Sequence, residues 1–172
     1  MERAPQTSGA RAAPAWRRGL PPALKLPPPS AVSDAMSMLL DGGVKVTGAE
    51  PDGVSLAGWL RCLLIDDIDR AVGAMLVEPP CAVRFGGSLL MLGDEEIDEL
   101  LKDHRLSEDV VEGCQEALNV LSATLNAIEG NLHIRVGRLF PLSRGPLEWL
   151  PRIRGRRAYD FEDYGRVILV AG

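Results

Sequence analysis

The sequence has few of the residues that build disulfide frameworks or zinc sites, and it has no long hydrophobic run. Only three of its 172 residues are cysteines, Cys62, Cys81 and Cys114, and no two of them form a C-x-x-C pair. An odd number of widely spaced cysteines argues against a disulfide framework or a zinc site and favours a reducing cytoplasm. We expect all three to be small buried hydrophobic residues. No apolar run approaches the roughly 18 to 20 residues that a membrane-spanning helix needs, so no membrane contact is expected.

Acidic residues outnumber basic ones outside the first 29 residues. Residues 1–29 hold five Lys or Arg against one Glu, a net charge of +4, and the total of −5 leaves −9 on the other 143 residues. Seven of the 13 prolines also lie in residues 1–29. We expect this segment to be a disordered basic Pro-rich extension, or the result of a start codon assigned too early, and residues 30–172 to form one domain. An acidic domain argues against nucleic acid as a partner, because phosphate binding needs clustered Lys and Arg.

The order of apolar segments and breakers predicts an α+β domain. Helices are expected in four places: 31–41, 81–92, a short segment from Asp94, and 107–127. Strands are expected in five places: 44–46, 56–65, 70–77, 132–136 and 166–171. Residues 142–160 are predicted to be a loop. Helices and strands in this order indicate helices packed on a sheet rather than an all-α or all-β fold.

The helix predicted over 107–127 has one apolar and one polar face. At 100° per residue, an apolar stripe lies on one side and must face a core: Val110, Cys114, Ala117, Leu121, Leu125 and Ile128. A polar ridge lies on the opposite side: Glu112, Glu116, Asn119, Ala123 and Asn126. Asparagine is a poor residue inside a helix, and two of the three asparagines in the chain lie on this ridge. This placement favours a functional ridge over an ordinary solvated face.

The polar ridge resembles the motif of the CheC, CheX and FliY chemotaxis phosphatases, which reads Asp/Ser-x3-Glu-x2-Asn-x21-Pro. This chain reads Glu112-x3-Glu116-x2-Asn119-x21-Pro141, so three of the four positions match, and Glu112 stands where the family has Asp or Ser. CheC and FliY carry two copies of the motif, whereas this chain has one, which is the CheX arrangement. The resemblance covers residues 55 to 141 and implies a CheX-like domain over 30–172, an α/β sandwich of long helices on an antiparallel or mixed sheet.

The resemblance implies hydrolysis of the aspartyl phosphate on a CheY-like receiver domain of a response regulator. Asn119 would orient the attacking water, Glu116 would pair with a lysine of the receiver, and Glu112 would make a weaker outer contact. Pro141 would shape the loop beside the helix. The receiver would supply the Mg²⁺, so the resemblance implies no cofactor or metal of the chain's own. It also implies a homodimer. A non-catalytic adaptor that binds a receiver or switch-complex partner is the alternative, because Glu112 departs from the family pattern.

Three further segments carry charge or apolar character of their own. The acid cluster at 66–69 lacks the full ligand set of a calcium loop and is predicted to be a hairpin turn. Five arginines lie between residues 144 and 157, where they form either a solvated basic loop or a contact for an acidic partner surface. The apolar strand at 167–170 would pair with a second chain if it lay at a sheet edge.

Overall fold

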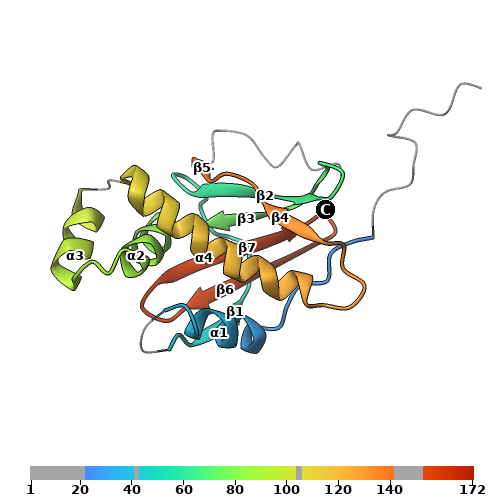
Figure 1. The fold of residues 1–172 in the computed structure, drawn as a ribbon, viewed down its shortest axis with the longest axis horizontal. Coiled ribbons are helices and arrows are strands. Elements are labelled where there is room, and N and C mark those ends of the chain that lie inside the picture. Colours follow the sequence, from blue (N-terminus) through green and yellow to red (C-terminus); the bar gives the residue numbers. More distant parts are fainter. Residues whose placement is uncertain (1–21, 41–42, 104–105, 142–152) are drawn as a thin grey trace, which may run out of the picture.

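The computed structural model describes residues 22–40, 43–103, 106–141 and 153–172 (Figure 1). Its helices are α1 (Pro29–Ser37), α2 (Pro79–Leu89), α3 (Asp94–Lys102) and α4 (Glu108–Asn126). Its strands are β1 (Val46–Ala49), β2 (Leu60–Asp66), β3 (Ala71–Val77), β4 (Ile134–Val136), β5 (Phe140–Pro141), β6 (Gly155–Phe161) and β7 (Gly165–Ala171). The α+β prediction is confirmed, and each predicted helix is present close to its expected bounds.

The strands form one sheet in which every described pairing is antiparallel, in the order β1-β6-β7-β3-β2-β4. β4 and β5 both pair with β2, β4 at its C-terminal end and β5 at its N-terminal end. Between them, the Gly137 N–H donates to the carbonyl oxygen of Leu63 at 2.8 Å. β4 and β5 therefore form one interrupted edge strand, and this edge lies next to α4.

Strand β6 lies in a segment that the sequence predicts to be a loop, and this prediction is wrong. β6 pairs with both β1 and β7, and its residues Ala158, Tyr159 and Phe161 are buried. The arginines of β6 are not a basic loop, because Arg156 pairs with Asp52 and Arg157 donates to the carbonyl oxygen of Pro27 at 2.7 Å. Charged residues that alternate with buried ones conceal a strand from a reading based on polarity. The arginines at 144 and 152 lie outside the described residues.

Strand β7 is in the interior of the sheet, so it does not offer an edge to a second chain. It pairs with β6 on one side and with β3 on the other along its whole length. Self-association through residues 167–170 is therefore excluded. The apolar composition of this strand has a different cause: both of its faces are covered, and Val167, Ile168, Leu169 and Val170 are all buried.

The two faces of the sheet belong to two separate apolar clusters. α4 lies across one face, and α1 and α2 pack beside it (Figure 1). Val167 and Leu169 of β7 point into this larger cluster, whereas Ile168 and Val170 point to the opposite face and pack with Trp59. The alternation of side chains along β7 thus places successive residues in different cores. α4 is held on the larger core, which fixes the orientation of its opposite face.

Two glycines allow α2 and α4 to cross in close contact. A Cβ atom at Gly86 of α2 would lie 2.1 Å from the carbonyl oxygen of Val110, and one at Gly113 of α4 would lie 2.9 Å from the Cα of Gly86. Backbone atoms of the two helices therefore occupy the space that a side chain would need. This close approach accounts for glycine within α2, where it otherwise weakens a helix by roughly 1 kcal/mol relative to alanine.

Residues 22–28 lie against the domain, although the sequence places them in the extension. The Lys25 N–H donates to Asn131 Oδ1 at 2.8 Å, and the Asn131 side chain donates back to the Lys25 carbonyl oxygen at 2.9 Å. Leu24 is buried in the larger core. Burial raises the pKa of Tyr159 to about 12, so its hydroxyl stays protonated and donates to Pro27 at 2.8 Å. These residues are part of the folded domain, and the prediction for residues 1–21 lies outside the described residues.

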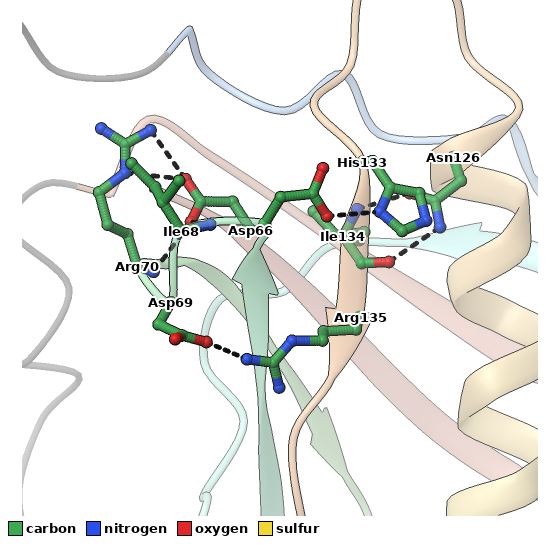
Figure 2. Close-up of polar contacts among 9 residues, drawn as sticks. Asp66, Ile68, Asp69, Arg70, Asn126, His133, Ile134 and Arg135 are labelled. Atoms are coloured by element: carbon green, nitrogen blue, oxygen red, sulfur yellow. Dashed lines mark hydrogen bonds and ion pairs between the residues drawn. The ribbon is translucent and has the colours of Figure 1, made fainter.

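The turn between β2 and β3 is organised by the buried carboxylate of Asp66 (Figure 2). Its Oδ1 accepts the N–H groups of Ile68 at 3.1 Å and Arg70 at 2.9 Å, and its Oδ2 accepts the Arg70 Nε at 2.8 Å. Burial acts to raise the pKa of Asp66, but the hydrogen bonds from Arg70 and Ile68 outweigh it and hold that pKa below its ordinary value of 3.8. The acid cluster is a hairpin turn, as predicted.

The two exposed acids of this turn contact the neighbouring edge strand. Asp67 Oδ1 lies 2.8 Å from His133 Nδ1, and Asp69 pairs with Arg135 (Figure 2). Both pairs are largely exposed, so each contributes little to stability. They link the turn to β4, the edge strand that lies next to α4.

Replacing the Asp66 carboxylate should lower stability in a pH-dependent way. Because the folded pKa is depressed, the stabilisation is complete above the unfolded pKa of 3.8 and is lost as the pH falls through the folded pKa. We expect Asp66→Asn to lower the free energy of unfolding by about 1 to 2 kcal/mol at pH 7. The difference from wild type should shrink below pH 4, as urea unfolding at several pH values would show. Asp67→Asn, which removes an exposed charge from the same turn, should have little effect. A difference that stayed constant down to pH 2 would contradict this account.

Candidate functional site

Both ends of α4 are fixed by side chains. At its start, Ser107 Oγ accepts the N–H of Val110 at 3.3 Å, as expected of an N-cap. At its end, Asn126 Oδ1 accepts the N–H of Ile134 and Asn126 Nδ2 donates to the Ile134 carbonyl oxygen, both at 2.9 Å (Figure 2). Asn126 therefore joins α4 to β4, and its presence on the polar ridge has a structural cause. Asn119 is the ridge asparagine that this cause does not explain.

The rotation of α4 about its axis is the one that the sequence predicts. Most of the apolar stripe is buried at 0 to 1% exposure: Val110, Cys114, Ala117, Leu121 and Leu125. The polar ridge is exposed: Glu112, Glu116, Asn119, Ala123 and Asn126. Because the apolar stripe is buried, α4 has little freedom to rotate or shift, and the polar ridge on its opposite face is held in place.

Glu116 and Asn119 form a polar pair at the middle of the ridge. Asn119 Nδ2 donates to Glu116 Oε2 at 3.4 Å, a long hydrogen bond that leaves both side chains accessible. The amide oxygen of Asn119 has no hydrogen-bond partner among the residues that the structure describes. The pair thus presents a carboxylate and an amide, one turn apart on a rigid helix, with capacity left to bind other groups.

A groove runs between α4 and the edge strand formed by β4 and β5, and we name it the α4–β5 groove. It has a volume of about 450 Å³. α4 lines it with Glu108, Val111, Glu112, Gln115 and Asn119, and the opposite wall is residues 136–140. Gln115 Nε2 donates to the Gly137 carbonyl oxygen at 3.0 Å and so joins the two walls. Of the predicted site residues, Glu112 and Asn119 line this groove, whereas Glu116 lies on the ridge outside it.

Pro141 directly follows the wall formed by residues 136–140. It lies in β5 opposite Leu60 and is exposed, and the preceding Phe140 lines the groove. Proline has no N–H to donate, so it suits an edge strand. The 21-residue spacing from Asn119 to Pro141 therefore spans the return of the chain from α4 to the opposite wall. The sequence did not indicate that Gln115, Arg138 or Phe140 belong to the site. Only Phe140 had a signal that could have revealed it, because it directly precedes Pro141 of the motif.

Among the residues that the structure describes, the cysteines and the other possible metal ligands form no second cluster. All three cysteines are free and buried, as predicted. Burial raises the pKa of Cys62 to about 12 and also raises the pKa values of Cys81 and Cys114, so none is a thiolate near neutral pH. Within the described ranges, no three His, Cys, Asp or Glu residues are placed to hold a metal ion. No helix in those ranges is both long and apolar enough to span a membrane.

Comparison with known proteins gives matches in structure only. No family model matches the sequence, and no curated protein matches it. A chain of the CheX–CheY–BeF3–Mg²⁺ complex from Borrelia burgdorferi matches with a TM-score of 0.48 at 13% identity, over 83% of this chain and 92% of that chain. A chemotaxis protein CheX from Desulfovibrio desulfuricans matches with a TM-score of 0.46 at 12% identity, over 82% and 92%.

Proposed function

We propose that this protein accelerates hydrolysis of the aspartyl phosphate on a CheY-like receiver domain. The observation that carries the proposal is the exposed Glu116–Asn119 pair on the solvent face of α4, held by the buried stripe behind it. The pair supplies the Glu and Asn of the motif Glu112-x3-Glu116-x2-Asn119-x21-Pro141, and Pro141 directly follows Phe140 of the opposite wall.

The chemistry requires little from the phosphatase. An aspartyl phosphate is an acyl phosphate with a good carboxylate leaving group, so no covalent intermediate on this chain is needed. The receiver supplies the Mg²⁺ and a lysine that neutralise the phosphoryl oxygens. In-line attack still needs a positioned water, the role that a glutamine amide fills in small GTPases.

Asn119 has the chemical properties needed to position this water. Its amide both donates and accepts hydrogen bonds and does not titrate, so it can hold a water in one orientation over a wide pH range. Its side chain is exposed on the solvent face of α4, from which it could reach the phosphorylation site of a receiver. The oxygen of the water forms the new P–O bond, the bond to the aspartate carboxylate breaks, and inorganic phosphate leaves.

Glu116 and Glu112 would set the position of the helix on the receiver. The carboxylate of Glu116 is within hydrogen-bond reach of Asn119 and would pair with the receiver's lysine. Glu112, one turn nearer the start of α4, is exposed at the groove and would make an outer contact. Receivers of this type are cytoplasmic, so the proposal places the protein in the cytoplasm.

The test measures the lifetime of the receiver phosphate. Each CheY-like receiver domain encoded in the source genome is phosphorylated with labelled acetyl phosphate, and its decay is followed with and without this protein. We expect faster decay for at least one receiver, by about 100-fold at saturation. Binding to a receiver without faster decay would support a non-catalytic adaptor, which the Glu at position 112 favours. No binding and no acceleration with any receiver would contradict both functions.

A further inference from the structure

We propose that the α4–β5 groove is a docking site for an apolar side chain of the receiver that lies beside a basic residue of the same receiver. The inference rests on the proposed function, because it assigns the groove to the partner whose phosphoryl group Asn119 would meet. It adds a contact that the motif does not contain, and it makes Phe140 a residue that determines affinity.

Phe140 is an aromatic side chain that the fold leaves on the surface. It is 53% exposed in β5, at the edge of the sheet. Together with the partly buried Val111 and Val136, it gives the groove an apolar lining. Aromatic residues are enriched in protein interfaces, because covering such a ring removes a large apolar area from water. An apolar side chain of the partner is the group that fits this part of the groove.

The charge of the α4 wall selects a basic neighbour for that side chain. The charged residues that line the groove are Glu108 and Glu112 on α4 and Arg138 on the opposite wall. Glu116 lies on the ridge beside them, so three exposed acids spaced four residues apart face one cation, and α4 itself contains no Lys or Arg. Like charges at this spacing repel one another and weaken the helix. A Lys or Arg of the receiver would relieve the repulsion, whereas an acidic segment would increase it.

The groove is already formed before any partner binds. The Gln115–Gly137 hydrogen bond joins its walls, and β5 is paired with β2 behind Phe140. The Gly137 N–H is bonded to Leu63, so the short segment between β4 and β5 is also held. Because both walls are fixed, little conformational entropy is lost on docking. Asn119 lines the same groove, so one receiver can occupy the groove and meet the ridge together.

The test separates affinity from chemistry in Phe140→Ala. The dephosphorylation rate is measured as a function of the concentration of phosphorylated receiver. Met38→Ala is the matched control, because Met38 is an apolar side chain that is 85% exposed and lies outside the groove. We expect Phe140→Ala to raise KM by about tenfold and to change kcat by less than twofold. Glu112→Lys should also raise KM, because it would repel the basic residue. Met38→Ala should match wild type.

Binding to the receiver activated with BeF3⁻ is measured in parallel. If wild type binds without accelerating decay, the phosphatase proposal fails, and weaker binding by Phe140→Ala still supports docking. An unchanged KM and affinity in Phe140→Ala, or a fall in kcat alone, would overturn the docking proposal. A wild-type dimer that becomes a monomer in Phe140→Ala would also overturn it, since the occupant would be a second copy of this chain. If wild type binds no receiver, both proposals fail.

Discussion

Asn119→Ala should lower the maximal rate of receiver dephosphorylation by about 100-fold, the cost of losing one positioned hydrogen-bonding group in a transition state. The methyl group neither donates to nor accepts from the attacking water. The fold should be unaffected, because Asn119 is exposed and its side chain makes only the 3.4 Å bond to Glu116 among the described residues. Stopped-flow or radiolabel decay at saturating phosphatase gives the rate, and thermal unfolding checks the fold.

Two further variants show whether this loss is specific. Asn119→Asp keeps the size of the side chain but replaces the donor with a negative charge beside the phosphoryl group, so we expect activity as low as in Asn119→Ala. Asp109→Asn removes a charge from the same helix, where Asp109 is exposed and does not line the α4–β5 groove, and it should retain full activity. If Asn119→Asp remained active, the amide donor of Asn119 would play no part in the reaction.

Gly86→Ala should destabilise the protein by at least about 2 kcal/mol. The added Cβ would lie 2.1 Å from the Val110 carbonyl oxygen, and backbone atoms cannot rotate away as a side chain can. α2 and α4 would have to separate, at a cost above the usual 1 to 3 kcal/mol for overpacking. The better helix propensity of alanine returns only about 1 kcal/mol. Urea unfolding measures the change.

Gly155→Ala is the control for this prediction. A Cβ at Gly155 would meet Ala171 at 3.9 Å, an ordinary contact, so the substitution should leave stability within about 1 kcal/mol of wild type. Because α4 carries the ridge, a shift of α4 away from α2 in Gly86→Ala should also lower dephosphorylation activity. Wild-type stability in Gly86→Ala would show that the helices do not cross as closely as described.

The sequence predicted α4 well because several independent signals agree there. Ser107 caps the helix, the apolar residues recur with helical period, and the breaker Gly130 follows. β6 was missed because it begins with Gly155, Arg156 and Arg157, although Ala158, Tyr159 and Phe161 are buried. Residues 22–28 were placed in the extension for a similar reason. Their proline content hides the contacts of Leu24 and Pro27 with distant parts of the chain, which no local pattern reveals.

The candidate site was predictable only where it lies on one element. Glu112, Glu116 and Asn119 share a helix face, and their spacing alone brings them together. The opposite wall comes from β4 and β5, whose position depends on pairing with β2, a contact between segments far apart in sequence. A shared helix face can also mislead. Asn126 lies on the ridge, which suggested a function, but its side chain forms hydrogen bonds with the backbone of Ile134.

The most direct test of the central claim compares wild type and Asn119→Ala on one phosphorylated receiver, with affinity for the BeF3⁻-activated receiver measured alongside. The account predicts that wild type shortens the phosphate lifetime, that Asn119→Ala does not, and that the two proteins bind the activated receiver with similar affinity. Equal shortening of the lifetime by both proteins would contradict the role assigned to Asn119.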